Sequence, residues 1–279
     1  MENRWLKPLY ETVEAEFSHT WLPSHDHTHH RRVWLFAKEL VRALCTEGCH
    51  FSESKLEQLI IAVFFHDTGL TQTLDASHGR ESREICRKFL NGFSAFSTDS
   101  AETILAAVEK HDDKTYAESF PPGKELPDDI LTMLAVCDDL DAFGATGVFR
   151  YLEIYVQRGV PLRMMPEKVL ENLEKRFHFL VQNFNMLGNF IQVHKKRYHY
   201  TADFYRKMGL QFASDPGRTV DTGPVKVVGL LTEKILHERI PVAEIGSHIQ
   251  VSELDEFSYH YFSRLEKEHK GSLQGEWQP

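Results

Sequence analysis

The sequence predicts an all-α protein that folds as a compact bundle of several helices. Apolar residues recur mostly three and four positions apart, as on one face of a helix, and the alternation typical of strands is scarce. The composition, with 42% hydrophobic and 26% charged residues, is ordinary for a globular protein. A chain of 279 residues can bury a substantial core, either as one large domain or as a domain with an appendage.

The first two predicted helices cover residues 28–48 and 53–66. Their apolar residues fall at helical spacing, so each helix has one face that is expected to pack in the core. The first face comprises Val33, Phe36, Ala37, Leu40, Val41 and Leu44, and the second comprises Leu56, Leu59, Ile60, Val63 and Phe64.

Three more helices are predicted before residue 140. Ser77 or Asp75 is expected to cap a helix over residues 78–91, which Asn91-Gly92 would end. Thr98, Asp99 or Ser100 is expected to cap the next helix, and PDD at residues 127–129 ends a loop and opens the third. The apolar faces of these last two helices comprise Ile104, Ala107 and Val108, and Ile130, Leu131, Leu134 and Ala135.

The C-terminal half predicts two long helices, over residues 166–187 and 190–209. The stretch at residues 214–225 is rich in Gly, Pro, Ser, Thr and Asp and is interpreted as a linker. We therefore expect a helical core over residues 1–213, and a linker with a mostly helical appendage over residues 214–279. One helix is expected in the appendage, which would pack on the core or on another subunit, so a homo-oligomer stays open.

Charge and hydropathy limit the function classes. The formal charge of −9 argues against a general nucleic-acid binder, because phosphate backbones are bound by basic surfaces. The N-terminus shows no apolar signal region, and the longest apolar run, at residues 59–65, is too short to span a bilayer. We expect a cytoplasmic protein without a membrane partner.

Metal-competent side chains lie on or at the end of the apolar face in five predicted helices. They are His29, His66, Asp67, His78, His111 and Asp138. A single histidine on an apolar face is more often a hydrogen-bonded core residue than a metal ligand. The same placement in five helices is harder to explain by chance. A buried carboxylate such as Asp67 or Asp138 is costly unless it is paired or binds a cation. The mixed imidazole and carboxylate set suits Mn, Fe, Ni, Co or Mg better than structural zinc.

Histidines also crowd the start of the first predicted helix. Because His29 lies on the apolar face, the neighbouring His25, His27 and His30 are assigned mostly to the surface. His25 and Asp26 are expected to cap this helix or to support the ligands.

Four motifs carry a family resemblance. HDHTHHRRV at residues 25–33 resembles the HDxxHxxRV opening of bacterial HD-domain metal-dependent phosphohydrolases, and FFHDTGL contains the HD pair. DDLDAFGATGVFR at residues 138–150 is similar to the family's ADxLDAxGxxGxxR segment, and RYHYTADF at residues 197–204 resembles the element that ends its helical core. The likeness extends to about residue 210 and implies an all-α HD-domain bundle around a metal site.

The resemblance implies one divalent ion bound by His29, His66, Asp67 and Asp138. His78 and His111 occupy positions where two-metal relatives have further ligands, with Asp67 bridging the ions. With a single ion, His78 and His111 would instead support the ligands or contact the substrate, and either could serve as general acid or base. Both versions stay open, and Asp67 is catalytic in either. Asp139 stands where relatives often have a basic residue, which leaves the substrate preference open.

The expected function is hydrolysis of a small phosphate ester or anhydride, with a nucleotide as the leading candidate. A bound divalent ion lowers the pKa of its water and neutralises the charge that develops on phosphorus. Arg32, Arg150 and Lys114 are expected to bind the anionic phosphate substrate.

Two other function classes stay open. A di-iron HD-domain oxygenase would require both His78 and His111 as ligands. A non-catalytic regulatory protein would keep the metal only for folding.

Overall fold

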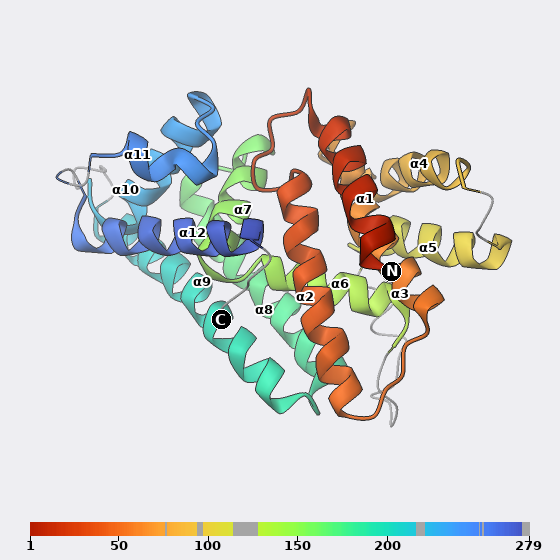
Figure 1. Cartoon of the computed structure of the whole chain (residues 1–279). Helices are drawn as coiled ribbons and strands as arrows, with labels where there is room; N and C mark the ends of the chain where they lie inside the picture. The colour runs from red at the N-terminus through yellow and green to blue at the C-terminus, as the bar shows by residue number, and fades with distance from the viewer. Residues whose placement is uncertain are drawn as a thin grey trace. The chain divides into compact units, whose positions relative to one another are not determined.

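The computed structural model describes residues 1–75, 77–93, 97–113, 128–215, 221–250, 252 and 254–274. In this part of the chain every regular element is helical, which confirms the predicted all-α class (Figure 1). No helix among these residues has the length and apolarity needed to cross a membrane. The chain forms two compact units, which are described separately. The first comprises Met1–Thr20, His25–Leu140 and His178–Gln192, and the second comprises Trp21–Ser24, Asp141–Phe177 and Val193–Pro279.

The first unit contains the five helices that were predicted before residue 140, and one helix that was not. The helices are α1 (Glu2–Phe17), α2 (His27–Thr46), α3 (Glu53–Phe65), α4 (His78–Leu90), α5 (Thr98–Lys110) and α6 (Ile130–Asp141, to Leu140 in this unit), with a 3-10 turn, η1 (Thr68–Thr71), after α3. Helix α1 packs on α2 and α3, α3 packs on α5, and α4 packs on α5 and η1. The unpredicted α1 buries four residues at a spacing of four, namely Trp5, Leu9, Val13 and Phe17.

The helix starts agree with the sequence in some cases and correct it in others. Asp26 caps α2, because its carboxylate accepts a 2.9 Å hydrogen bond from the Thr28 amide. Ser77 occupies the start of α4 but makes no side-chain cap bond. The cap of α5 is Ser97, whose hydroxyl accepts from an amide three residues later, so the expectation of a cap at residues 98–100 was wrong by at least one position.

The second unit holds the C-terminal helices. They are α7 (Gly144–Gln157), α8 (Met165–Phe184, to Phe177 in this unit), α9 (Gly188–Ser214, from Val193 in this unit), α10 (Gly223–Leu230), the π-helical segment η4 (Leu231–His237), α11 (Ile245–His248) and α12 (Glu256–Gln274). Two of the predicted features were wrong. The segment after residue 225 forms more than the single predicted helix, and α10 begins inside the predicted linker, of which residues 216–220 lie outside the described residues. The domain boundary at residue 213 stays a prediction.

Helix α12 packs on the N-terminus of α7 within this second unit. The Glu268 carboxylate accepts hydrogen bonds from the Ala145 and Thr146 amides at 3.1 and 2.9 Å, which satisfies two donors at the free end of α7. Gly144, with φ of +86°, allows this approach, since a Cβ there would lie 2.8 Å from Glu268 Oε1. The C-terminal helix is therefore anchored through a charge-assisted cap.

Candidate metal centre

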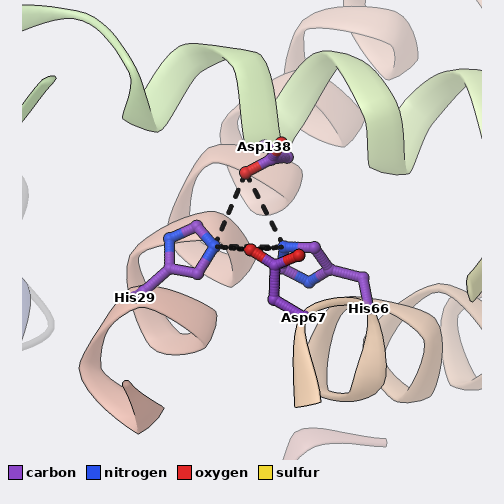
Figure 2. Close-up of side chains that lie close together, drawn as sticks. All are labelled: His29, His66, Asp67 and Asp138. Atoms are coloured by element: carbon purple, nitrogen blue, oxygen red, sulfur yellow. Dashed lines mark hydrogen bonds and ion pairs between the residues drawn. The ribbon is translucent and has the colours of Figure 1, made fainter. Parts of the chain in front are cut away.

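Four of the predicted ligands meet in the core of the first unit (Figure 2). His29 comes from α2, His66 follows α3 and is followed by Asp67, and Asp138 lies on α6. The Nε2 atoms of His29 and His66 lie 3.0 Å apart. The His29 Nε2 atom is 3.4 Å from Asp67 Oδ2 and 3.5 Å from Asp138 Oδ1, and the corresponding distances from His66 Nε2 are 3.6 and 3.7 Å. We call these residues the first group.

Asp67 also belongs to a second group, which it forms with His78 and His111. Its Oδ1 atom lies 3.0 Å from His111 Nε2 and 3.3 Å from His78 Nε2. The two imidazole Nε2 atoms are 3.4 Å apart. Asp67 thus offers one carboxylate oxygen, Oδ2, to the first group and the other, Oδ1, to the second. All six side chains are buried.

Three of the histidines are oriented in the same way by the backbone. His66 and His111 stand directly after α3 and α5, and each Nδ1–H donates a 2.8 Å hydrogen bond to the carbonyl three residues earlier. His78, at the start of α4, donates in the same manner to the Asp75 carbonyl at 2.9 Å. A carbonyl can only accept, so Nδ1 carries the proton in each ring and Nε2 is left to face the Asp67 carboxylate.

This arrangement requires positive charge beside Asp67. If the imidazoles were neutral, their Nε2 lone pairs would face carboxylate oxygens at hydrogen-bonding distance, which is repulsive without a proton or a cation between them. Histidine ligands that donate Nδ1–H to a carbonyl and present Nε2 are typical of metal sites. The residues therefore fit a divalent metal ion, bound by imidazole nitrogens and carboxylate oxygens.

In the absence of metal, the pKa values of His66, His78 and Asp67 also favour positive charge beside the Asp67 carboxylate. Burial alone would lower the pKa of His66 and of His78, but Asp67 and further acceptors outweigh it and raise both, that of His78 to about 9. Burial would raise the pKa of the Asp67 carboxyl, yet the charge of His66 and hydrogen bonds from the other imidazoles hold it well below its usual range. Asp67 therefore stays ionised, and metal binding would displace protons from His66 and His78.

Two glycines let α4 approach closely enough to bring His78 to this site. A Cβ at Gly69, in η1, would lie 2.0 Å from the His78 carbonyl oxygen. A Cβ at Gly79 would lie 2.3 Å from the Glu109 carbonyl oxygen near the end of α5. Neither position tolerates a side chain without a shift of α4, so both glycines are needed for the second group.

The three predicted phosphate-binding residues do not all belong to the described part of the first unit. Arg32 is buried in α2 of the first unit and donates to Thr28 Oγ1 at 3.0 Å. Arg150 belongs to the second unit, where it pairs with Asp141 at 3.2 Å. Lys114 lies outside the described residues. The assignment of these three residues to phosphate stays a prediction.

Two histidines near the first group were misjudged from the sequence. His30, assigned mostly to the surface, is fully buried, and His25 is only 6% exposed. The His30 Nδ1–H donates to the Val63 carbonyl at 3.2 Å, and its ring lies 4.9 Å from that of His66. Its spacing of three and four residues from the buried Val33 and Trp34 was the available signal.

Comparison with protein families matches residues 27–143 to the HD domain. The match runs from the first residue of α2 to the residue before α7. It includes all six residues of the two groups, namely His29, His66, Asp67, His78, His111 and Asp138. No curated protein and no solved structure matches the chain. In residues 27–143, which are 117 of the 279 residues, the chain is therefore similar to the HD domain.

Proposed function

We propose that the chain is a metal-dependent phosphohydrolase that acts on a small phosphate ester or anhydride, with a nucleotide as the first candidate. The observation that carries this proposal is the convergence of six buried imidazole and carboxylate side chains inside the segment that is similar to the HD domain. The HD-domain superfamily includes metal-dependent phosphohydrolases.

The first group would bind one divalent ion through His29, His66, Asp67 and Asp138. When bound, such an ion supplies an activated water and neutralises charge on the phosphoryl oxygens. The protein's contribution is to hold the ligand atoms in place. In His66 the bond from Nδ1–H to Val63 fixes the tautomer, and the buried Asp67 carboxylate stays ionised.

The second group supports a second ion. Asp67 presents different oxygens to the two groups, which is what a carboxylate bridging two ions requires. With a single ion, His78 and His111 would instead hold protons close to Asp67 Oδ1 and serve as general acid and base. Counting the ions bound per chain separates these two versions.

Phosphate recognition is assigned to Arg32, Arg150 and Lys114. An arginine pairs with phosphate through two parallel N–H donors, so the two arginines are the stronger candidates. The formal charge of −9 argues against a nucleic-acid substrate, and we propose a small phosphate compound in a cytoplasmic setting instead.

A di-iron oxygenase is the second candidate function, because the approach of both His78 and His111 to Asp67 meets the requirement stated for it. Iron content and oxygen consumption distinguish it from a hydrolase. The third candidate, a regulatory protein stabilised by metal, predicts that removal of the metal unfolds the domain although no phosphate ester is hydrolysed.

The test couples metal analysis to a phosphate-release screen. Nucleotides and sugar phosphates are offered with Mn²⁺, Co²⁺, Ni²⁺, Fe²⁺ or Mg²⁺ to the wild type, to a His66→Ala, Asp67→Ala double variant, and to a His260→Ala, Asp203→Ala control at exposed positions of α12 and α9. We expect release from the wild type and the control only. Equal release from the double variant, or full retention of metal by it, would refute the assignment of the site.

A further inference from the structure

We propose that His30 is a positioning residue for the metal ligand His66, and that it acts by donating a second hydrogen bond to the backbone carbonyl that orients the His66 ring. The inference rests on the metal centre of the proposed function but is independent of the reaction catalysed there.

The shared acceptor is the carbonyl of Val63. His66 Nδ1–H donates to it at 2.8 Å, and His30 Nδ1–H donates to it at 3.2 Å. Val63 lies in the last turn of α3, where carbonyls lose their backbone partners, so its oxygen has lone pairs for both donors. The position of this carbonyl decides where the His66 Nε2 atom points. His30 provides a second hydrogen bond that holds the carbonyl in place.

The ring of His30 is also packed against the ligands. Its centroid lies 4.9 Å from that of His66 and 5.3 Å from that of His29, and Phe17 of α1 approaches it to 5.7 Å. His30 is fully buried. It therefore fills the space behind both imidazoles of the first group and restrains the rotation of the His66 ring.

The chemistry of the side chain argues for a role in hydrogen bonding rather than in packing alone. The His30 Nε2 atom is buried and has no hydrogen-bond partner among the described residues. An unsatisfied buried nitrogen costs free energy that a phenylalanine of similar size would avoid. The presence of an imidazole at position 30 is explained by its other nitrogen, because Nδ1–H donates to the Val63 carbonyl.

The second group provides an internal contrast. His111 donates to the Val108 carbonyl with the same 2.8 Å geometry, but no second imidazole reaches that carbonyl in the described part of the chain. The additional hydrogen bond from His30 thus distinguishes His66 from His111, which is otherwise placed in the same way.

The test uses three substitutions that separate the donor from the ring. His30→Phe keeps a ring but has no donor, His30→Asn places an amide N–H near the position of Nδ1, and His30→Gln places it near the position of Nε2. Metal-free proteins are titrated with Co²⁺, and the dissociation constant and the visible spectrum of the bound ion are recorded. His27→Phe on the same helix is the control, since His27 lies outside both groups.

We expect His30→Phe and His30→Gln to weaken binding of the first Co²⁺ ion by about 10- to 100-fold and to change its spectrum. His30→Asn should restore most of the affinity and the wild-type spectrum. Thermal unfolding of the metal-free variants reports on folding, and if His30→Phe does not fold, the comparison of Asn with Gln carries the test.

Wild-type affinity and spectrum in His30→Phe, or equal losses in His30→Asn and His30→Gln, would overturn the proposal for His30. Failure of the wild type to bind Co²⁺ would overturn the metal centre as well. Absence of phosphate release from a wild type that binds Co²⁺ would contradict the proposed function alone.

Discussion

A histidine follows each of α3 and α5 with the same local geometry, but the two histidines belong to different groups of ligands. His66 and His111 each follow the last helical residue and donate Nδ1–H to the carbonyl three residues earlier. Among the described residues, His66 is grouped with His29, Asp67 and Asp138, whereas His111 is grouped with His78 and the shared Asp67. A helix end can therefore fix the orientation of an imidazole, but the neighbouring helices decide how many ligands join it. We expect the first group to bind its ion more tightly than the second.

Replacement of the shared residue should remove the difference between the two groups altogether. Asp67→Asn keeps the shape of the side chain but removes the charge that both sets of imidazoles face. We expect loss of bound metal and a fall of phosphate release to background, measured by elemental analysis and a phosphate assay. Asp203→Asn, at an exposed site on α9, is the control. Metal retained at the wild-type level by Asp67→Asn would show that the groups do not depend on this carboxylate.

Single substitutions at the two helix ends should separate the groups. His66→Ala is expected to abolish binding of the tighter ion, because it removes one of the four ligands of the first group. His111→Ala should leave that ion in place and lower phosphate release by about 10²-fold, as expected for loss of a general acid or of a weaker second site. Metal content and turnover of both variants are compared under one set of conditions. Identical losses in the two variants would contradict the proposed ranking.

The close approach of α4 can be disturbed without touching a ligand. Gly69→Ala or Gly79→Ala should lower the free energy of unfolding by about 1–3 kcal/mol, since either Cβ would meet a backbone oxygen at 2.0 or 2.3 Å. The shift of α4 should weaken the second group and spare the first. Denaturant unfolding and metal stoichiometry report the two effects. Gly229→Ala is the control, because no heavy atom lies within 4 Å of its Cβ position, and equal behaviour of the three variants would refute the argument.

The pH dependence of the metal-free protein tests the coupling between His78 and Asp67 in the wild type. The pKa of His78 is raised to about 9 in the folded state, so its stabilising contribution is fully present below the unfolded value of 6.5 and is lost as the pH rises through 9. The pKa of Asp67 is lowered, so its contribution is lost in acid, below the unfolded value of 3.8. The melting temperature should fall by on the order of 5 °C between pH 6.5 and 9.5. His78→Asn should remove most of this slope, and an unchanged slope would contradict the coupling to Asp67.

The sequence predicted those features of the fold that depend on local spacing. The apolar periods located α2 to α6, and the same periods brought His29, His66 and Asp138 to the core side of their helices. Ser97 was missed as the cap of α5 because adjacent Ser, Thr and Asp residues are nearly equivalent caps. Helix α1 was overlooked although its apolar spacing of four was visible.

Other features of the site depend on contacts between helices and were beyond sequence reasoning. The partners of His30, which are Phe17 and the Val63 carbonyl, come from two other helices and could not be read from its helical spacing. The need for Gly79 arises from the Glu109 carbonyl on α5. The placement of Asp67 between two groups could be expressed from the sequence only as alternatives, since it requires the relative positions of α3, α4 and α5.

The central claim is that the first group binds a divalent ion, and anomalous X-ray diffraction from crystals grown with Mn²⁺ tests it most directly. We predict a manganese peak coordinated by His29, His66, Asp67 and Asp138, with a second and weaker peak at Asp67, His78 and His111 if two ions bind. Absence of a peak at the first group, or a peak only elsewhere in the molecule, would contradict the claim.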